Sequence, residues 1–286
     1  MLRLAGFLIL VLSVFGGFTM ANGKLMALWQ PAEIVIIVGA AVGAFMVANP
    51  SSVQKLVATH LHYVIVKQAG FEKDFFMELL QLEYQLFDLL RTKGAAGIED
   101  HIESPENSEI FTAYPRIIAH KRLLHFITDN FRITGMTNIT PHELEGLLEQ
   151  EIHTLEADLK RPGDALQSIA DACPGFGIVA AVMGIVITMQ SMDGPIGEIG
   201  AHVAAALVGT FLGILLCYGI VGPLASAVSY TAQNECLAFD CVKSALVSCQ
   251  LGRPPILAVD AGRRVLYDEL RPTFLELERW LRGSRE

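Results

Sequence analysis

The sequence carries little charge. Only 18% of its 286 residues are Asp, Glu, Lys or Arg, whereas 52% are hydrophobic, and soluble globular chains have about 25% charged residues. This deficit argues against an ordinary water-soluble domain and makes membrane-spanning helices the first expectation. The net charge of −9 argues against a nucleic-acid partner, because contacts with a phosphate backbone need a basic surface.

The sequence also lacks the motifs of the common enzyme classes. It contains no Walker loop, no HExxH and no GxSxG, and its eight histidines do not have the spacing of metal ligands. Its five cysteines form no CxxC pair, which indicates reduced packing residues rather than a disulfide framework or a metal site. We therefore expect no enzyme, no bound cofactor and no metal.

Long apolar runs account for the excess of hydrophobic residues. The third and fourth runs reach the roughly 20 residues that a spanning helix needs, and the first and second are near the lower end of the range. The first run could be taken for a signal peptide, but Thr19-Met20-Ala21 is a poor cleavage site and a second run follows closely. The runs are Leu4–Ala21, Ala32–Ala48, Pro174–Met192 and Ile199–Ser226.

These runs predict an all-α membrane protein with four transmembrane helices in two hairpins and a helical cytoplasmic domain. The expected spans cover about residues 3–21, 32–49, 168–192 and 199–226. The expected parts are a first hairpin at 1–50, a cytoplasmic domain at 51–165, a second hairpin at 166–226 and C-terminal cytoplasmic helices at 227–286.

The distribution of Lys and Arg predicts the orientation of the chain. Of 21 such residues, 11 lie between Ser51 and Arg161 and 8 follow Tyr230, whereas only Lys24 lies in a hairpin loop. Cytoplasmic segments of membrane proteins carry the excess of cations. We therefore expect a multi-pass protein with both termini in the cytoplasm.

The segment from Ser51 to Ala165 has the apolar periodicity of amphipathic helices. One helix is expected to end at Arg91-Thr92-Lys93-Gly94, with cations in its last turn and glycine after it. Another is expected to begin at the capping box Thr140-Pro141-His142-Glu143. Behind this capping box, six side chains are expected to share one face: Leu144, Leu147, Leu148, Ile152, Leu155 and Leu159.

The third and fourth runs are nearly free of ionisable residues. The third has none and the fourth has only His202, while the one carboxylate of the first two runs is Glu33, beside the outer loop. Both runs are rich in glycine and alanine, which lets helix backbones pack closely. Charge transfer across a bilayer needs a titratable or coordinating group near mid-depth. If the protein conducts ions, the carrying carboxylate is therefore expected to come from another chain.

Polar residues and prolines in these runs leave alternatives open. Thr210 either bonds a carbonyl of its own preceding turn or, with Tyr218 as a further polar residue, lines a narrow polar path. Pro174 and Pro223 either mark helix ends, the interpretation favoured for Pro174, or act as two hinges at one depth. Pro223 is expected to kink its helix.

Four stretches of the chain resemble MotA, the family of flagellar motor stator subunits, and more loosely the ExbB and TolQ energising subunits. The resemblance extends from Gly16-Gly17 to Arg271-Pro272. ExbB and TolQ have three spans, so the four expected here favour MotA. The stretches are Gln30–Ile37, Tyr114–Arg116, Pro174–Gly184 and Val208–Leu215.

The resemblance implies a motor mechanism in a bacterial inner membrane. MotA-like subunits form a ring of five around two copies of MotB, a single-span protein whose aspartate carries the ion. Ion passage turns the ring, and its cytoplasmic domain pushes the rotor protein FliG. By position, the resemblance assigns ion-path positions to Thr210 and Ala181, coupling to Pro174, Pro223 and the preceding acid Asp171, and rotor binding to Arg91 and Glu99.

The resemblance also bears on the ion that is carried. Sodium-driven relatives tend to have a threonine in the third span near the ion site, where this chain has Ala181, which lacks an oxygen ligand. We therefore expect protons. Two other functions stay open on the sequence: a subunit that energises outer-membrane transport, as ExbB and TolQ do, and a membrane scaffold that conducts no ion.

Overall fold

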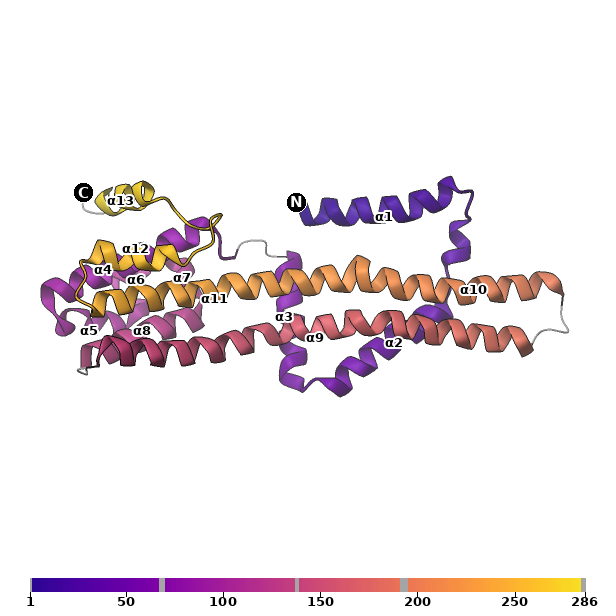
Figure 1. Ribbon diagram of the computed structural model, residues 1–286, viewed down its shortest axis with the longest axis horizontal. Helices are drawn as coiled ribbons and strands as arrows, with labels where there is room; N and C mark the ends of the chain where they lie inside the picture. The colour runs from indigo at the N-terminus through magenta and orange to yellow at the C-terminus, as the bar shows by residue number, and fades with distance from the viewer. Residues whose placement is uncertain (1, 67–69, 137–138, 191–194, 284–286) are drawn as a thin grey trace. The chain divides into compact units, whose positions relative to one another are not determined.

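The computed structural model describes residues 2–66, 70–136, 139–190 and 195–283. Every regular element among these residues is a helix (Figure 1). The chain divides into two compact units, which we call the apolar unit (residues 1–66 and 160–229) and the polar unit (residues 67–159 and 230–286). Helices α9 (Pro141–Gln190) and α11 (Gly222–Gln250) each contribute residues to both units.

The apolar unit contains the helices that are able to cross a membrane. Three helical stretches have the necessary length and hydropathy, and a shorter apolar helix covers Leu4–Met20; the three are Leu25–Ala48, Pro141–Gln190 and Ile199–Gln250. Large apolar side chains such as Ile178 and Ile185 are more than half exposed along α9, which is typical of helices that face lipid. The other helices of this unit are α1 (Leu2–Met20), η1 (Leu25–Leu28), α2 (Pro31–Ala48), α3 (Ser51–Val66), α10 (Ile196–Leu215) and η3 (Leu216–Val221).

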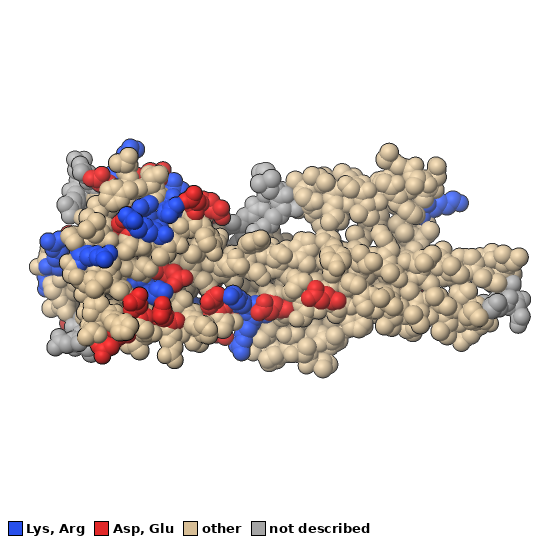
Figure 2. All heavy atoms as spheres, viewed as in Figure 1, with Lys and Arg blue, Asp and Glu red and all other residues tan. Residues whose placement is uncertain are grey.

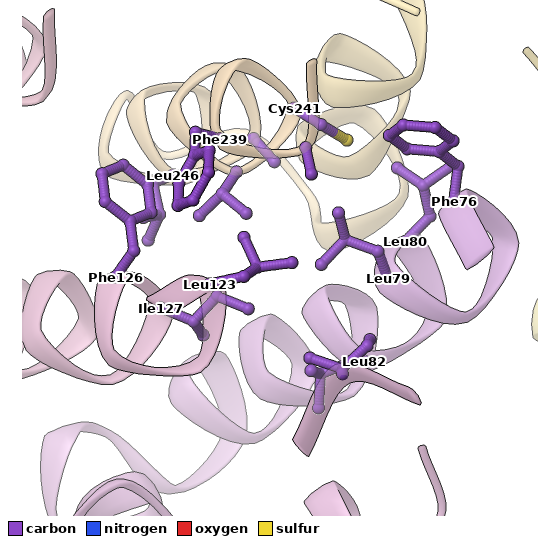
Figure 3. Close-up of a cluster of buried hydrophobic side chains, with 14 of the residues drawn as sticks. Phe76, Leu79, Leu80, Leu82, Leu123, Phe126, Ile127, Phe239, Cys241 and Leu246 are labelled. Carbon is purple, nitrogen blue, oxygen red and sulfur yellow. The ribbon is translucent and has the colours of Figure 1, made fainter. Parts of the chain in front are cut away.

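The polar unit carries most of the charged residues and has a conventional apolar core. In the view of Figure 2, Lys, Arg, Asp and Glu gather over this unit, and most of the visible surface of the apolar unit is uncharged. Side chains from three helices meet in the core (Figure 3): Phe76, Leu79, Leu80, Leu82, Leu123, Phe126, Ile127, Phe239, Cys241 and Leu246. Its remaining helices are α4 (Lys73–Lys93), α5 (Ala95–Glu103), η2 (Pro105–Asn107), α6 (Glu109–Thr112), α7 (Pro115–Ala119), α8 (Lys121–Met136), α12 (Pro255–Arg264) and α13 (Phe274–Gly283).

Local chemistry sets the helix ends of the polar unit as predicted. Helix α4 ends at Lys93, and Gly94 follows with φ +71°, a left-handed conformation that suits glycine. The predicted capping box is also confirmed. The Thr140 N–H donates to the Glu143 carboxylate at 2.9 Å, and the Glu143 N–H donates to the Thr140 hydroxyl at 3.3 Å.

The predicted buried face behind the capping box is correct except at Leu147. Leu144, Leu148, Ile152 and Leu159 are buried and Leu155 packs partly against the core, whereas Leu147 is 53% exposed. A helix turns about 100° per residue, which puts Leu147 about 100° away from the centre of the stripe formed by the others. Hydrophobicity alone did not separate Leu147 from its neighbours.

Helix α9 runs through Pro174 without ending. Pro162 and Pro174 both lie inside its 50 residues, so the expectation that Pro174 marks a helix end is wrong. A proline removes one backbone donor from the helix. Apolar helices tolerate this loss because neighbouring helices and small local adjustments satisfy the freed groups.

Pro223 follows a π-helical segment rather than an ordinary turn. In η3 the Gly222 N–H bonds the Cys217 carbonyl, five residues back, directly before the proline that has no N–H to give. Cys173, beside Pro174, packs in one cluster with Cys217. Pro223 lies six residues beyond Cys217, about 9 Å further along the helix, so the two prolines do not lie at one depth.

Helices α9 and α10 approach so closely that side chains are excluded between them. A Cβ on Gly177 would lie 2.9 Å from the Gly209 carbonyl oxygen, and a Cβ on Gly213 would lie 2.7 Å from the Cys173 carbonyl oxygen. One on Gly184 would lie 2.9 Å from the Ala206 Cβ. The glycines predicted to let helices pack closely therefore do so within one chain, along the line that we call the α9–α10 seam.

Glu83 is an unusual member of the polar-unit core. Its side chain in α4 is fully buried, and neither carboxylate oxygen has a hydrogen-bond partner in the described part of the chain. Burial raises the pKa of Glu83 from 4.5 to about 8, because an apolar environment disfavours the charged form. The nearby Cys249 thiol has its pKa raised to about 11, first by burial and second by the charge of Glu83.

We expect Glu83 to make the polar unit less stable as the pH rises. Between pH 4.5 and about 8 the folded state keeps the Glu83 proton while the unfolded state releases it, so the free energy of unfolding falls through this window. At pH 7 the loss amounts to about 3 kcal/mol. Thermal unfolding of the full chain in detergent is expected to show this slope, and Glu83→Gln is expected to flatten it.

The matched control is Glu106→Gln, which changes an exposed carboxylate. It is expected to leave the pH dependence of the unfolding temperature unchanged. If the unfolding temperature fell with pH equally steeply in the unsubstituted chain and in the Glu83→Gln variant, burial of Glu83 would not be the cause.

Candidate functional site

The α9–α10 seam brings together two of the residues that the resemblance assigned to an ion path. A Cβ on Gly209 would lie 3.3 Å from the Ala181 backbone nitrogen, and Thr210 follows Gly209 directly. Tyr218 does not join them, because it lies eight residues further on in η3 and is 73% exposed. The site is therefore centred on Ala181, Gly209 and Thr210.

The hydroxyl of Thr210 is available within this site. Thr188, on the facing helix, donates to the Gly184 carbonyl four residues back at 2.8 Å. The half-buried Thr210 forms no such bond, and its hydroxyl has no hydrogen-bond partner among the described residues. The first alternative for Thr210, a hydrogen bond to a carbonyl of its own helix, is therefore not found. The Thr210 hydroxyl can accept a hydrogen bond from, or donate one to, a water or a partner chain.

Glu33 lies in this site, where the sequence analysis did not place it. Its Cγ would be 3.4 Å from a Cβ on Gly209, and the residue is only 7% exposed. Gly209 is 13 residues into α10, which corresponds to about 20 Å along the helix axis. Glu33, near the start of α2, thus lies beside the middle of α10 rather than at the first turn of α10, and α10 contacts both η1 and α2.

The local sequence around Glu33 gave a partial signal. A single carboxylate at the start of an otherwise apolar helix is unusual in a membrane. Which residues of other helices lie next to Glu33 depends, however, on how α2 is placed along α9 and α10. No local sequence pattern shows that placement.

The coupling residues occupy different surroundings. Asp171 is exposed and accepts a hydrogen bond from the Gln167 amide at 2.8 Å. Pro174 is half-buried inside α9, and Pro223 is exposed at the start of α11. The structure therefore places Asp171 and Pro174 on one helix, one turn apart, and Pro223 behind the π-helical segment.

Arg91 and Glu99 are both on the surface of the polar unit. Arg91 lies in the last turn of α4, Glu99 lies in α5, and Gly94 turns the chain between them. Arg91 makes no ion pair or hydrogen bond with the described residues and borders a cavity of about 290 Å³ with Tyr84, Asp88, Pro254, Pro255, Ile256, Glu278 and Leu281. Both charges are thus presented outward, at the two sides of one turn.

The part of the chain that the structure describes contains no cluster of three or more His, Cys, Asp or Glu residues that could hold a metal ion. The chemistry available at the seam is that of one carboxyl group, one hydroxyl group and backbone carbonyls. Such groups can bind and pass protons, and they can orient water.

Comparison with protein families gives two successive matches, with residues 95–116 between them. Residues 4–94 match the family described as Motility protein A N-terminal, and residues 117–240 match the MotA/TolQ/ExbB proton channel family. Among solved structures, the chain is similar to MotAB of C. jejuni, with a TM-score of 0.75 and 17% identity over 94% of this chain and 97% of that chain. The fold is therefore that of the stator protein structures.

Curated relatives match over nearly the whole chain. Chemotaxis protein LafT of Vibrio parahaemolyticus is 46% identical over 281 residues, which cover 98% of each protein. Motility protein A of Salmonella typhimurium is 42% identical over 285 residues, which cover 100% of this chain and 96% of the relative. The chain therefore belongs to the motility protein A family, within the proton channel family that also includes TolQ and ExbB.

Proposed function

We propose that the chain is a flagellar motor stator subunit that forms a proton channel with a MotB-like partner and converts proton flow into torque. The observation that carries the proposal is the 42–46% identity to LafT and Motility protein A over nearly the full chain. The MotAB titles of the similar structures support a MotB-like partner and an assembly of several subunits. The two full-length relatives named above are a chemotaxis protein and a motility protein, which favours a motor over outer-membrane transport.

The membrane topology in this proposal has four spans. Helices α1 and α2 form the first hairpin. The second half of α9 and the helix from α10 to α11 form the second hairpin. The protein lies in the inner membrane of a bacterial cell, with both termini in the cytoplasm. The three long apolar stretches and the shorter apolar helix α1 support these spans. The excess of Lys and Arg in residues 51–161 and after Tyr230 supports the orientation.

The partner supplies what this chain lacks. Helix α9 has no Asp or Glu from Pro174 to Gln190, and α10 has none from Ile199 to Leu215, so neither helix supplies a carboxylate along these stretches to carry an ion. A MotB-like aspartate would complete the path beside Thr210 and Ala181, within a ring of five copies of this chain. Ala181 offers no side-chain oxygen, which favours protons over sodium, because sodium needs several oxygen ligands.

Proton flux through the assembled complex tests the channel. The chain and its MotB-like partner, purified together and placed in liposomes, are expected to acidify the interior when an inward proton gradient is imposed, and neither protein alone is expected to do so. An imposed sodium gradient at constant pH is expected to have no effect. Flux that followed sodium, or its absence from the complete complex, would contradict the proposal.

Charge reversal at Arg91 tests the contact with the rotor protein FliG. Complementary charges at a moving contact steer partners without holding them tightly, so Arg91→Glu is expected to abolish swimming while membrane assembly and proton flux persist. Lys121→Glu, which reverses another exposed cation at the start of α8, serves as the control and is expected to swim. Normal swimming of the Arg91→Glu variant would exclude the proposed role.

A further inference from the structure

Two side chains in the apolar unit have buried polar atoms without a partner. They are Oε2 of Glu33 and Nδ1 of His202, and neither forms a hydrogen bond in the described part of the chain. Burying a polar atom without a hydrogen bond is costly, so native proteins contain few such atoms. Both residues are titratable, and the other buried unpartnered side-chain atoms belong to the polar unit.

Glu33 occupies space that the missing side chain of Gly209 leaves open. A Cβ on Gly209 would meet the Ala180 Cβ at 3.2 Å, the Ala181 nitrogen at 3.3 Å and the Glu33 Cγ at 3.4 Å. Glu33 is thus packed where α2 meets the α9–α10 seam. The carboxyl group comes from a third helix, although α9 and α10 contribute no carboxylate at this level.

His202 lies on the same side of α10, nearer its beginning. Residues 202, 206, 209 and 213 follow one another at steps of three or four, which puts them on one face of the helix. His202 is seven residues before Gly209, or about 10 Å along the axis. The contacts of Gly177 with Gly213 and of Gly184 with Ala206 set an antiparallel register that puts His202 level with Thr188.

Few charged residues occur along the helices that carry or contact these two groups. Helix α2 has no other ionisable residue and α9 has none from Pro174 to Gln190, whereas α10 has Glu198 four residues before His202. The packed segment η1 has no charge within it and is preceded by the exposed Lys24, and α1 has none after Arg3. A Glu33 carboxylate would therefore rely on a transient proton or on a partner chain for its counter-charge, whereas His202 has Glu198 one turn away along α10.

We propose that His202 and Glu33 are successive proton-binding groups on the outer part of the ion path, which is an inference that rests on the proposed channel function. His202 takes up a proton that comes from outside water onto its imidazole ring and becomes an imidazolium. It returns to neutral imidazole by releasing a proton through water to the Glu33 carboxylate, which becomes a neutral carboxylic acid. Glu33 then releases that proton toward the carrying carboxylate of the MotB-like partner and is a carboxylate again.

The chemistry of the two groups suits a proton better than a metal cation. Imidazole and carboxylate groups both accept and donate protons, whereas a sodium or divalent ion needs several oxygen ligands together. The separation of about 10 Å along the helix requires water between the groups.

The test measures proton flux per assembled complex in liposomes as a function of external pH. Glu33→Gln keeps the size of the side chain and removes its capacity to bind a proton, so the flux is expected to fall about tenfold, while Glu33→Asp retains most of it. His202→Gln is expected to flatten the dependence of flux on external pH. Because the groups act in series, His202→Gln is expected to add little once Glu33→Gln is present.

Two matched variants control for the substitutions themselves. Glu106→Gln and His62→Gln alter exposed residues and are expected to leave both the flux and its pH profile unchanged. Since flux is counted per assembled complex, a merely structural role of Glu33 would lower assembly and leave the flux and profile of the complexes that form unchanged.

The outcomes separate this inference from the proposed function. If the unsubstituted complex carries protons and Glu33→Gln carries them at the same rate with the same pH profile, the relay is wrong and the channel stands. If the unsubstituted complex carries no protons, the channel proposal itself fails.

Discussion

The close contact of α9 and α10 is the constraint on which the membrane part of this protein depends. Two helix backbones touch at Gly177 and Gly213, where even one added carbon atom would collide with a main-chain atom. Attraction between apolar helices in lipid comes chiefly from such van der Waals packing, because lipid is as apolar as the side chains. A continuous hairpin of this kind also explains why α9 can pass through Pro174 without a break.

This packing decides where polar groups can lie. Space left by Gly209 receives the side chain of Glu33 from α2, and Oε2 of Glu33 has no hydrogen-bond partner in the described part of the chain. No carboxylate occurs on α9 from Pro174 to Gln190 or on α10 from Ile199 to Leu215, so the proposed channel would take its carrying carboxylate from another chain.

Much of this could be predicted from the sequence wherever the cause is local. Gly94 ends α4, and Thr140 with Glu143 begins α9, because the stabilising contacts lie within a few residues of each other. The continuation of α9 through Pro174 could not be predicted in this way, because whether a helix tolerates a proline depends on the neighbouring helices. The surroundings of Glu33 likewise depend on the register between α2 and α10, and for that reason the sequence located Thr210 and Ala181 but not their carboxyl neighbour.

The most direct test of this arrangement is the distance across the seam in the membrane. A chain whose native cysteines are replaced, with Ala180→Cys and Gly209→Cys, has Cβ positions 3.2 Å apart, near the roughly 3.8 Å of a disulfide. Mild oxidation in membranes is expected to form a disulfide between these two cysteines. The control pair, Val179→Cys with Gly209→Cys, is expected to stay reduced, because the Val179 side chain is exposed. Equal cross-linking of both pairs, or none in either, would contradict the close packing of α9 and α10.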